Sequence, residues 1–280
     1  MKTDATLTML RLDLRDRGIS DNTSREYQRL VRPLLAQIDS YSGLDRATVA
    51  DWVHEARSDS SKRHRWLAVK ALSRMLVGED LLSSDPCVKL PMPKDVAPPQ
   101  PILSEDAYTA LLATCDRSYL GRRDRAILTM LGSTGARRTE LASLRLEDVD
   151  LDAGSIAIVK GKGGRSRRSW LDPTAIKACA SWLAARQAHS EPRLWLGTTG
   201  KPMTPDALKQ MVARRAEAAG VGRVTPHMFR RRLASRWLLE GGSESALMTT
   251  AGWTSPTMPA RYAAGALEQI AQREHARIFG

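Results

Sequence analysis

Residues 146–172 have the sequence LEDVDLDAGSIAIVKGKGGRSRRSWLD, and they are the part of a largely helical pattern that predicts β-structure. They contain a short strand near 149–151, an alternating β-branched run at 155–159, a glycine-rich turn and a second run at 166–171. We expect these segments to form a three-stranded antiparallel sheet. The predicted fold class is therefore mainly α with a small antiparallel β-sheet.

The turn of this hairpin carries basic side chains and no acidic one. They are Lys160, Lys162, Arg165, Arg167 and Arg168. Cations at this density repel one another unless a polyanion neutralises them. The GKGG sequence is not a Walker A phosphate loop, because that motif has a glycine five residues before its GK glycine, and residue 156 is isoleucine.

The charge of the whole chain favours the same kind of partner. Among 280 residues, 43 Lys and Arg outnumber 31 Asp and Glu, which gives a net charge of +12 and a pI near 10.0. Residues 1–97 hold 16 basic and 14 acidic side chains, whereas residues 98–280 hold 27 and 17. A polyanion such as nucleic acid is the leading partner, and the uneven distribution indicates two different units.

A proline-rich stretch separates these units. Six of the 14 prolines lie between Pro86 and Pro101, and such a stretch cannot stay helical. We expect a helical unit at 1–95, a linker at 96–102 and a larger unit at 103–280. Helical periodicity precedes the linker in four segments, at 5–18, 22–38, 46–57 and 61–77.

Several classes of protein are excluded by composition. No run approaches the roughly 18–20 apolar residues of a membrane span, and the N-terminus carries acids where a signal peptide is apolar. We therefore expect a soluble, cytoplasmic protein without a membrane partner. Three scattered cysteines, Cys87, Cys115 and Cys179, predict free thiols. The chain shows no Asp, Glu and His cluster with metal-ligand spacing, so we predict no metal site.

The last helical segment of the N-terminal unit presents a basic face. Its cations are Lys62, Arg63, Arg65, Lys70 and Arg74. They are candidate DNA contacts, and an ordinary solvated helix surface explains them equally well.

Three further segments carry residue types that suit phosphate chemistry. Residues 133–141, STGARRTEL, place a turn glycine before two arginines and a helix, where backbone donors and guanidinium groups favour an anion. Residues 225–233, TPHMFRRRL, put His227 and Arg230 on one face of a helix. Residues 251–262, AGWTSPTMPARY, end in Tyr262.

Together these segments resemble the tyrosine recombinase (phage integrase) family. TGxRxxEL, a GKG lysine, HxxR and a Gly-Trp followed by Tyr nine residues after the Trp occur in the order of that family. The resemblance covers the whole chain: the helical unit is similar to its core-binding (SAM-like) domain and 103–280 to its catalytic domain, which would form a C-shaped clamp on DNA. The segment LMTTAGWTSPTMPARYAAG resembles small actinobacterial phage and mobile-element integrases without an arm-binding domain.

The resemblance implies a role for each matching residue. Arg137 and Arg230 would brace the non-bridging oxygens of the scissile phosphate. Tyr262 would be the nucleophile, and His227 would take its proton, because a tyrosine hydroxyl ordinarily has a pKa near 10. Lys162 would protonate the leaving 5′ oxygen.

Further residues would support this site. Trp253 would pack against it and offer its indole N–H to a phosphate oxygen, and Glu140 would fix a basic side chain. The remaining cations would follow the DNA backbone: Lys160, Arg165, Arg167, Arg168, Arg231 and Arg232. Arg231 stands where many relatives have histidine.

The implied activity is site-specific cleavage and rejoining of DNA through a 3′-phosphotyrosine, for integration or excision of a phage or mobile element, without cofactor, metal or ATP. The implied partners are double-stranded core-type attachment sites, a possible directionality factor and other copies of the chain, as a tetramer on paired sites and a monomer or weak dimer when free. A trailing helix at 264–278 would dock on a neighbouring subunit, or alternatively on its own domain.

Rival interpretations of the function are a Xer-like resolvase, a type IB topoisomerase and a non-catalytic DNA-binding protein of the same fold.

Overall fold

The structure is a computed structural model that describes residues 3–94, 101–159, 166–186, 190–259 and 267–279. The chain divides into two compact units, an N-terminal unit at Met1–Pro98 and a C-terminal unit at Pro99–Gly280. The division falls within the proline-rich stretch. No described helix combines the length and apolar character needed to cross a membrane.

The N-terminal unit contains the four predicted helices. They are α1 (Thr3–Asp16), α2 (Asp21–Gln37), α3 (Arg46–His54) and α4 (Asp59–Gly78), with a short 3-10 turn at Tyr41–Gly43. Side-chain oxygens of Ser20, Asp45 and Ser58 cap the N-termini of α2, α3 and α4. Leucines such as Leu10 and Leu72 are fully buried between the helices, so this unit has a core of its own.

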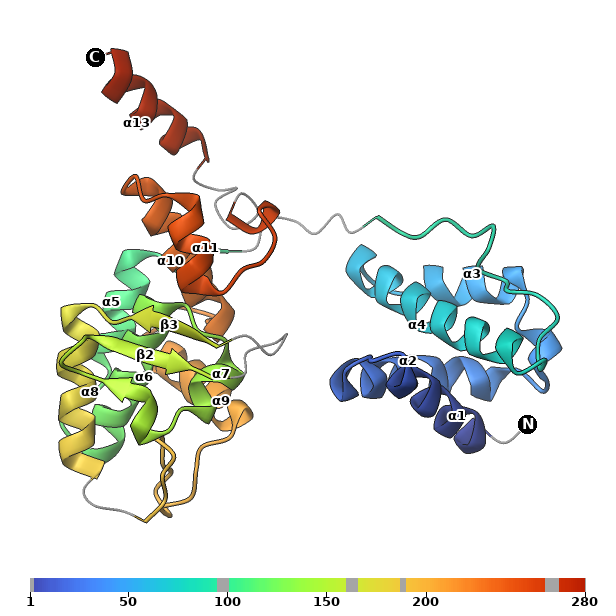
Figure 1. The fold of residues 1–280 in the computed structure, drawn as a ribbon, viewed down its shortest axis with the longest axis horizontal. Coiled ribbons are helices and arrows are strands. Elements are labelled where there is room, and N and C mark those ends of the chain that lie inside the picture. Colours follow the sequence, from blue (N-terminus) through green and yellow to red (C-terminus); the bar gives the residue numbers. More distant parts are fainter. Residues whose placement is uncertain (1–2, 95–100, 160–165, 187–189, 260–266, 280) are drawn as a thin grey trace. The chain divides into compact units, whose positions relative to one another are not determined.

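The C-terminal unit combines the predicted sheet with helices (Figure 1). Its described elements are α5 (Glu105–Ala113), α6 (Tyr119–Thr134), α7 (Arg138–Ser143), a 3-10 turn at Leu146–Asp148, β1 (Val149–Asp150), β2 (Ser155–Ile158), β3 (Arg167–Trp170), α8 (Pro173–Arg186), α9 (Pro205–Ala218), α10 (Pro226–Leu239), α11 (Glu244–Ala251) and α13 (Leu267–Phe279). The strands pair antiparallel in the order β1-β2-β3. Ile156 lies opposite Val149 on one side and Ser169 on the other. The predicted three-stranded sheet and the fold class are confirmed.

Helix α6 is the centre of this unit. It packs against α8, α10, α5 and β3, and it is buried around much of its circumference, as its apolar sequence AILTML requires. Ile127 of α6 shares a core with Phe229 of α10 and with Trp182 of α8. The Trp182 and Trp195 rings stack with centroids 6.3 Å apart. The helices that carry the candidate site are therefore fixed by one common core.

The end of α6 depends on a glycine. Gly135 has a φ of 57°, in the left-handed region, and a Cβ there would lie 2.9 Å from Leu233 Cδ2. Glycine ends the helix without this clash. The chain then turns so that Arg137, two residues later, becomes the N-cap of α7.

The trailing helix is present as α13, and residues 260–266 before it lie outside the described part of the chain. Arg273 of α13 donates a hydrogen bond to the Leu239 carbonyl at the end of α10, at 2.5 Å. Ile278 and Phe279 are 60% and 76% exposed, so the last turn of α13 presents apolar surface to solvent. The three cysteines are free thiols, as predicted.

Candidate active site

The first arginine of the site is held by a carboxylate one helical turn later. The Arg137 backbone N–H donates to Glu140 Oε2 at 2.8 Å, and Arg137 Nη1 donates to Oε1 at 2.7 Å. Glu140 lies at N3 of α7, where a glutamate closes a capping box. The Glu140 side chain is 4% exposed and that of Arg137 35% exposed. Glu140 therefore fixes a basic side chain that reaches solvent.

A second guanidinium, that of Arg167, binds the Glu140 carboxylate. Arg167 of β3 donates from Nη2 to Oε2 at 2.8 Å and from Nη1 to Oε1 at 3.2 Å. Burial alone would raise the pKa of the Glu140 carboxyl, but hydrogen bonds from Arg167 and Arg137 outweigh burial and lower this pKa to about 2. Glu140 is thus ionised at neutral pH.

Arg230 connects two helix ends through its buried guanidinium. Nη1 donates to the Gly135 carbonyl at 2.8 Å and Nη2 to the Ala251 carbonyl at 2.6 Å. The guanidinium carbon lies 5.0 Å from the centroid of the Trp253 ring, a cation–π distance. Pro226 at the start of α10 and the Thr225 N-cap set the direction of this helix.

Arg137, His227 and Arg230 meet at one pocket of about 310 Å³. Its other lining residues are Ala136, Arg138, Lys209, Thr225 and Pro226. The structure thus brings three of the predicted catalytic residues to one cavity, and places Trp253, 7% exposed, against Arg230. Guanidinium, ammonium and imidazole groups around one small cavity suit a phosphate group.

Four predicted site residues lie outside the described part of the chain. They are Lys160, Lys162, Arg165 and Tyr262. Their roles as backbone contacts, proton donor and nucleophile therefore stay predictions.

Two basic residues of the pocket are additional to the predicted site. Arg138 Nη1 also bonds Asp206 at 2.7 Å, which ties α7 to α9. Its position next to Arg137 in the STGARRTEL motif was a sequence signal that Arg138 lies at the same site. Lys209 comes from the first half of α9, where no motif marks it in the sequence.

Two of the predicted backbone contacts in the C-terminal unit need correction. Arg232 is 5% exposed; its Nη2 bonds Glu105 at 2.6 Å, and its guanidinium stacks 3.8 Å from the Tyr108 ring centroid. Arg167 is engaged by Glu140. Both are held towards the protein interior, Arg232 by the buried Tyr108 ring and Arg167 by the buried Glu140 carboxylate. Arg168 is exposed and Arg231 half-buried, so backbone contact by these two stays a prediction.

In the N-terminal unit, most of the predicted contacts have protein partners. Lys70 pairs with Asp85 at 2.5 Å and Lys62 with Asp59 at 3.3 Å. Arg63 donates a hydrogen bond to the Pro93 carbonyl. Arg65 donates to the Trp52 carbonyl and lies over the Trp52 ring. Arg74 is exposed. Arg74 has the most accessible of these side chains for a phosphate, and DNA contact by this face stays a prediction.

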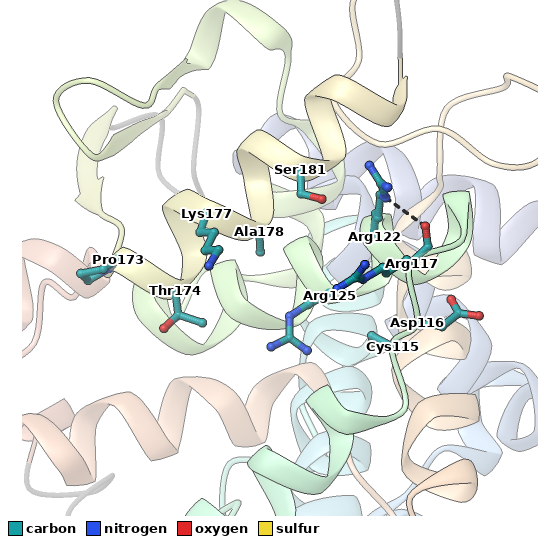
Figure 2. A pocket seen from close by; sticks show the side chains of 10 residues that line it. All are labelled: Cys115, Asp116, Arg117, Arg122, Arg125, Pro173, Thr174, Lys177, Ala178 and Ser181. Atoms are coloured by element: carbon teal, nitrogen blue, oxygen red, sulfur yellow. Dashed lines mark hydrogen bonds between the residues drawn. The ribbon is translucent and has the colours of Figure 1, made fainter.

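A larger pocket, of about 800 Å³, lies between the start of α6 and α8. Figure 2 shows the residues that line it, among them the basic side chains of Arg117, Arg122, Arg125 and Lys177. None of the predicted catalytic residues lines it, and burial raises the pKa of the Cys115 thiol, which leaves this thiol protonated at neutral pH. The smaller pocket is therefore the candidate active site. Among the described residues no group of three or more His, Cys, Asp or Glu is placed to hold a metal ion.

The profile of the Phage integrase family matches residues 101–268, more than half of the chain. The chain belongs to the phage integrase family. This membership confirms the resemblance inferred from the order of the motifs.

Relatives of this chain include proteins named as tyrosine recombinases. Tyrosine recombinase XerC of Mycobacterium sp. (strain JLS) is 32% identical over 250 residues, which cover 82% of this chain and 83% of that protein. Tyrosine recombinase XerD of Listeria monocytogenes serotype 4b (strain F2365) is 29% identical over 247 residues, covering 82% of each.

Solved structures show the same family fold. The Tn1549 transposon integrase in complex with transposon right end DNA matches with a TM-score of 0.73 at 20% identity, over 98% of this chain and 99% of that one. A lambda integrase dimer bound to a COC′ core site matches with a TM-score of 0.74 at 15% identity, over 93% and 94%. These similarities establish the fold and agree with the predicted fold class.

Proposed function

We propose that this protein is a site-specific tyrosine recombinase, which cleaves one DNA strand, holds it as a 3′-phosphotyrosine and rejoins it to a new partner. The observation that carries the proposal is the meeting of Arg137, His227 and Arg230 at one pocket, with Glu140 holding Arg137. The family of the chain supports the same activity.

We assign each group a step in the reaction. Two guanidiniums from separate elements can bind the phosphate oxygens from different directions and stabilise the charge that grows on them. His227, exposed at the pocket, accepts the proton of the attacking Tyr262 hydroxyl. Lys162 donates a proton to the leaving 5′ oxygen. One phosphoester replaces another, so the step needs no ATP, and the arginines supply the positive charge that a metal ion supplies in other phosphoryl-transfer sites.

The other tyrosines support Tyr262 as the nucleophile. The chain has five tyrosines, and Tyr27, Tyr41, Tyr108 and Tyr119 pack against the two hydrophobic cores. Burial raises the pKa of Tyr108 to about 12, which makes it a poorer nucleophile still.

The biological role that we propose is integration or excision of a phage or mobile element in the cytoplasm of a bacterial host. A Xer-like resolvase is the second candidate, since XerC and XerD proteins match over about four-fifths of their length. Recombination assays separate the two roles. A resolvase recombines two copies of one site within a plasmid dimer, whereas an integrase joins two sites of different flanking sequence.

We further propose that the active assembly is a tetramer on two paired core-type sites, with a monomer or weak dimer in the absence of DNA and a possible directionality factor. The exposed apolar end of α13, at Ile278 and Phe279, supports docking of this helix on a neighbouring copy.

The test of the activity starts from binding. Tyr262→Phe protein selects its target from randomised DNA duplexes, and a nicked suicide substrate is then built on the selected sequence. Wild-type protein is expected to form an SDS-resistant protein–DNA adduct, whereas Tyr262→Phe binds the duplex with unchanged affinity and forms none. A wild-type protein that binds but forms no adduct is a non-catalytic DNA-binding protein, and the proposal then fails.

A further inference from the structure

We propose that Arg167 is a positioning residue of the active site: it acts on the scissile phosphate only through Glu140 and Arg137, and it locks three segments of the site together. The inference rests on the proposed function, because it concerns the same pocket. It also replaces the prediction that Arg167 follows the DNA backbone.

The first observation is that hydrogen bonds fill both carboxylate oxygens of Glu140. Each of its oxygens accepts two hydrogen bonds, Oε1 from the guanidiniums of Arg137 and Arg167 and Oε2 from the Arg137 backbone N–H and Arg167. One buried carboxylate is thus shared by two cations. Without Arg167, the whole charge of Glu140 would act on Arg137 and neutralise the positive charge that Arg137 presents at the pocket.

The second observation is the contact of Arg167 with α11. Its Nε donates to the Thr250 carbonyl at 3.2 Å, and the next carbonyl, that of Ala251, accepts from Arg230 at 2.6 Å. Two guanidiniums therefore hold consecutive carbonyls at the C-terminal end of one helix, where the helix dipole favours positive charge. Trp253 follows directly after this end.

A glycine makes this approach possible. Gly252 has a φ of 64°, and a Cβ there would lie 2.8–2.9 Å from three atoms of the Arg167 side chain. Any larger residue would push Arg167 away from Thr250 and Glu140. The motif glycine before Trp253 thus has a structural reason that involves Arg167.

These contacts also explain why Arg167 does not touch DNA itself. Its Nε, Nη1 and Nη2 atoms all donate to protein acceptors, and its side chain is 10% exposed. Arg167 links β3 to α7 and to α11. A lysine would keep the charge but cannot make this set of bonds.

The test measures single-turnover adduct formation on the suicide substrate at saturating DNA. Arg167→Lys is expected to slow this rate by about 10- to 100-fold, since small displacements of a catalytic group have effects of this size, and to leave the dissociation constant for DNA within about twofold. Arg232→Lys is the matched control. It weakens another ion pair of a buried arginine in the same unit, that with the exposed carboxylate of Glu105 and without contact to Glu140, and is expected to cleave at the wild-type rate.

A double-mutant cycle separates positioning from mere structural support. If Arg167 acts through Arg137, then Arg167→Lys has little further effect, less than about threefold, in an Arg137→Ala background. Full additivity would overturn the inference, as would wild-type cleavage by Arg167→Lys. If Arg167→Lys does not fold, Gly252→Ala replaces it in both assays with the same expectations. Failure of wild-type protein to form any adduct refutes the proposed function instead, so the two failures are distinguishable.

Discussion

Arg230 combines two tasks that depend on the shape of its guanidinium. It bonds the carbonyls of Gly135 and Ala251 and also lines the pocket. Arg230→Lys keeps the charge but loses the planar pair of N–H donors that reaches both carbonyls. We therefore expect cleavage to slow by about 10²- to 10³-fold. DNA affinity should change little, because many other phosphate contacts remain. Adduct formation and a binding titration on the same duplex measure the two effects, and equal losses in both would contradict this assignment.

Glu140 predicts a pH dependence of stability. Its pKa of about 2 in the folded protein lies below the ordinary value of 4.5. A carboxyl with a lowered pKa stabilises the fold above its unfolded-state pKa and loses this contribution as the pH falls from about 4.5 towards 2. The shift corresponds to a free energy of unfolding on the order of 3 kcal/mol.

Glu140→Gln provides the comparison for this effect. Because glutamine does not titrate, the difference in unfolding free energy between wild type and Glu140→Gln should be largest near pH 6 and shrink below pH 4.5. Urea unfolding at several pH values measures it. A difference that stays constant down to pH 3 would show that the charge of Glu140 does not stabilise the fold.

At the scale of elements, local patterns were sufficient for the four helices of the N-terminal unit and for the sheet. Ser20 and Ser58 cap helices where the sequence shows serine before a periodic run, and β2 follows the alternating β-branched run. Contacts between distant elements were not predictable in this way. Arg167 lies 27 residues from Glu140, and only the packing of β3 beside α7 and α11 shows that its side chain faces inward rather than towards DNA.

Contacts between distant elements also explain the other differences between the predicted site and the observed one. Arg232 sits in the run of three arginines after Phe229, and neighbouring side chains on a helix point in different directions. Arg230 faces the pocket, whereas Arg232 is buried against Tyr108. Lys209 reaches the pocket from α9, and its neighbours in sequence carry no phosphate-binding pattern.

Helix α13 gives a prediction at this scale. A chain that ends at residue 266 lacks the exposed Ile278 and Phe279 but keeps all residues of the pocket. We expect this truncation to bind a single core site with wild-type affinity and to lose the tetramer on paired sites, because the docking surface is gone. Sedimentation of the protein–DNA complexes measures the assembly, with Ile278→Ser/Phe279→Ser as a variant of full length. A truncated protein that still forms tetramers would contradict docking by α13.

At the scale of the whole molecule, the boundary between the two compact units coincides with the change in net charge along the chain. The core around Leu10 and Leu72 shares no residue with the core around Ile127 and Phe229, so each unit buries its own apolar surface. Residues 98–280 carry 27 of the 43 basic side chains against 17 acidic ones. The unit that holds the candidate active site is therefore also the strongly basic one, and we expect its affinity for DNA to fall steeply with salt.

The proposed activity depends on a covalent bond between this chain and DNA. Mass spectrometry of the adduct, after digestion with nuclease and trypsin, locates that bond directly. We predict a nucleotide joined through its 3′-phosphate to Tyr262, in the peptide that begins after Arg261, and no such peptide from Tyr262→Phe protein. A nucleotide on any other residue, or no modified peptide from wild-type protein that has bound its selected site, would contradict the central claim.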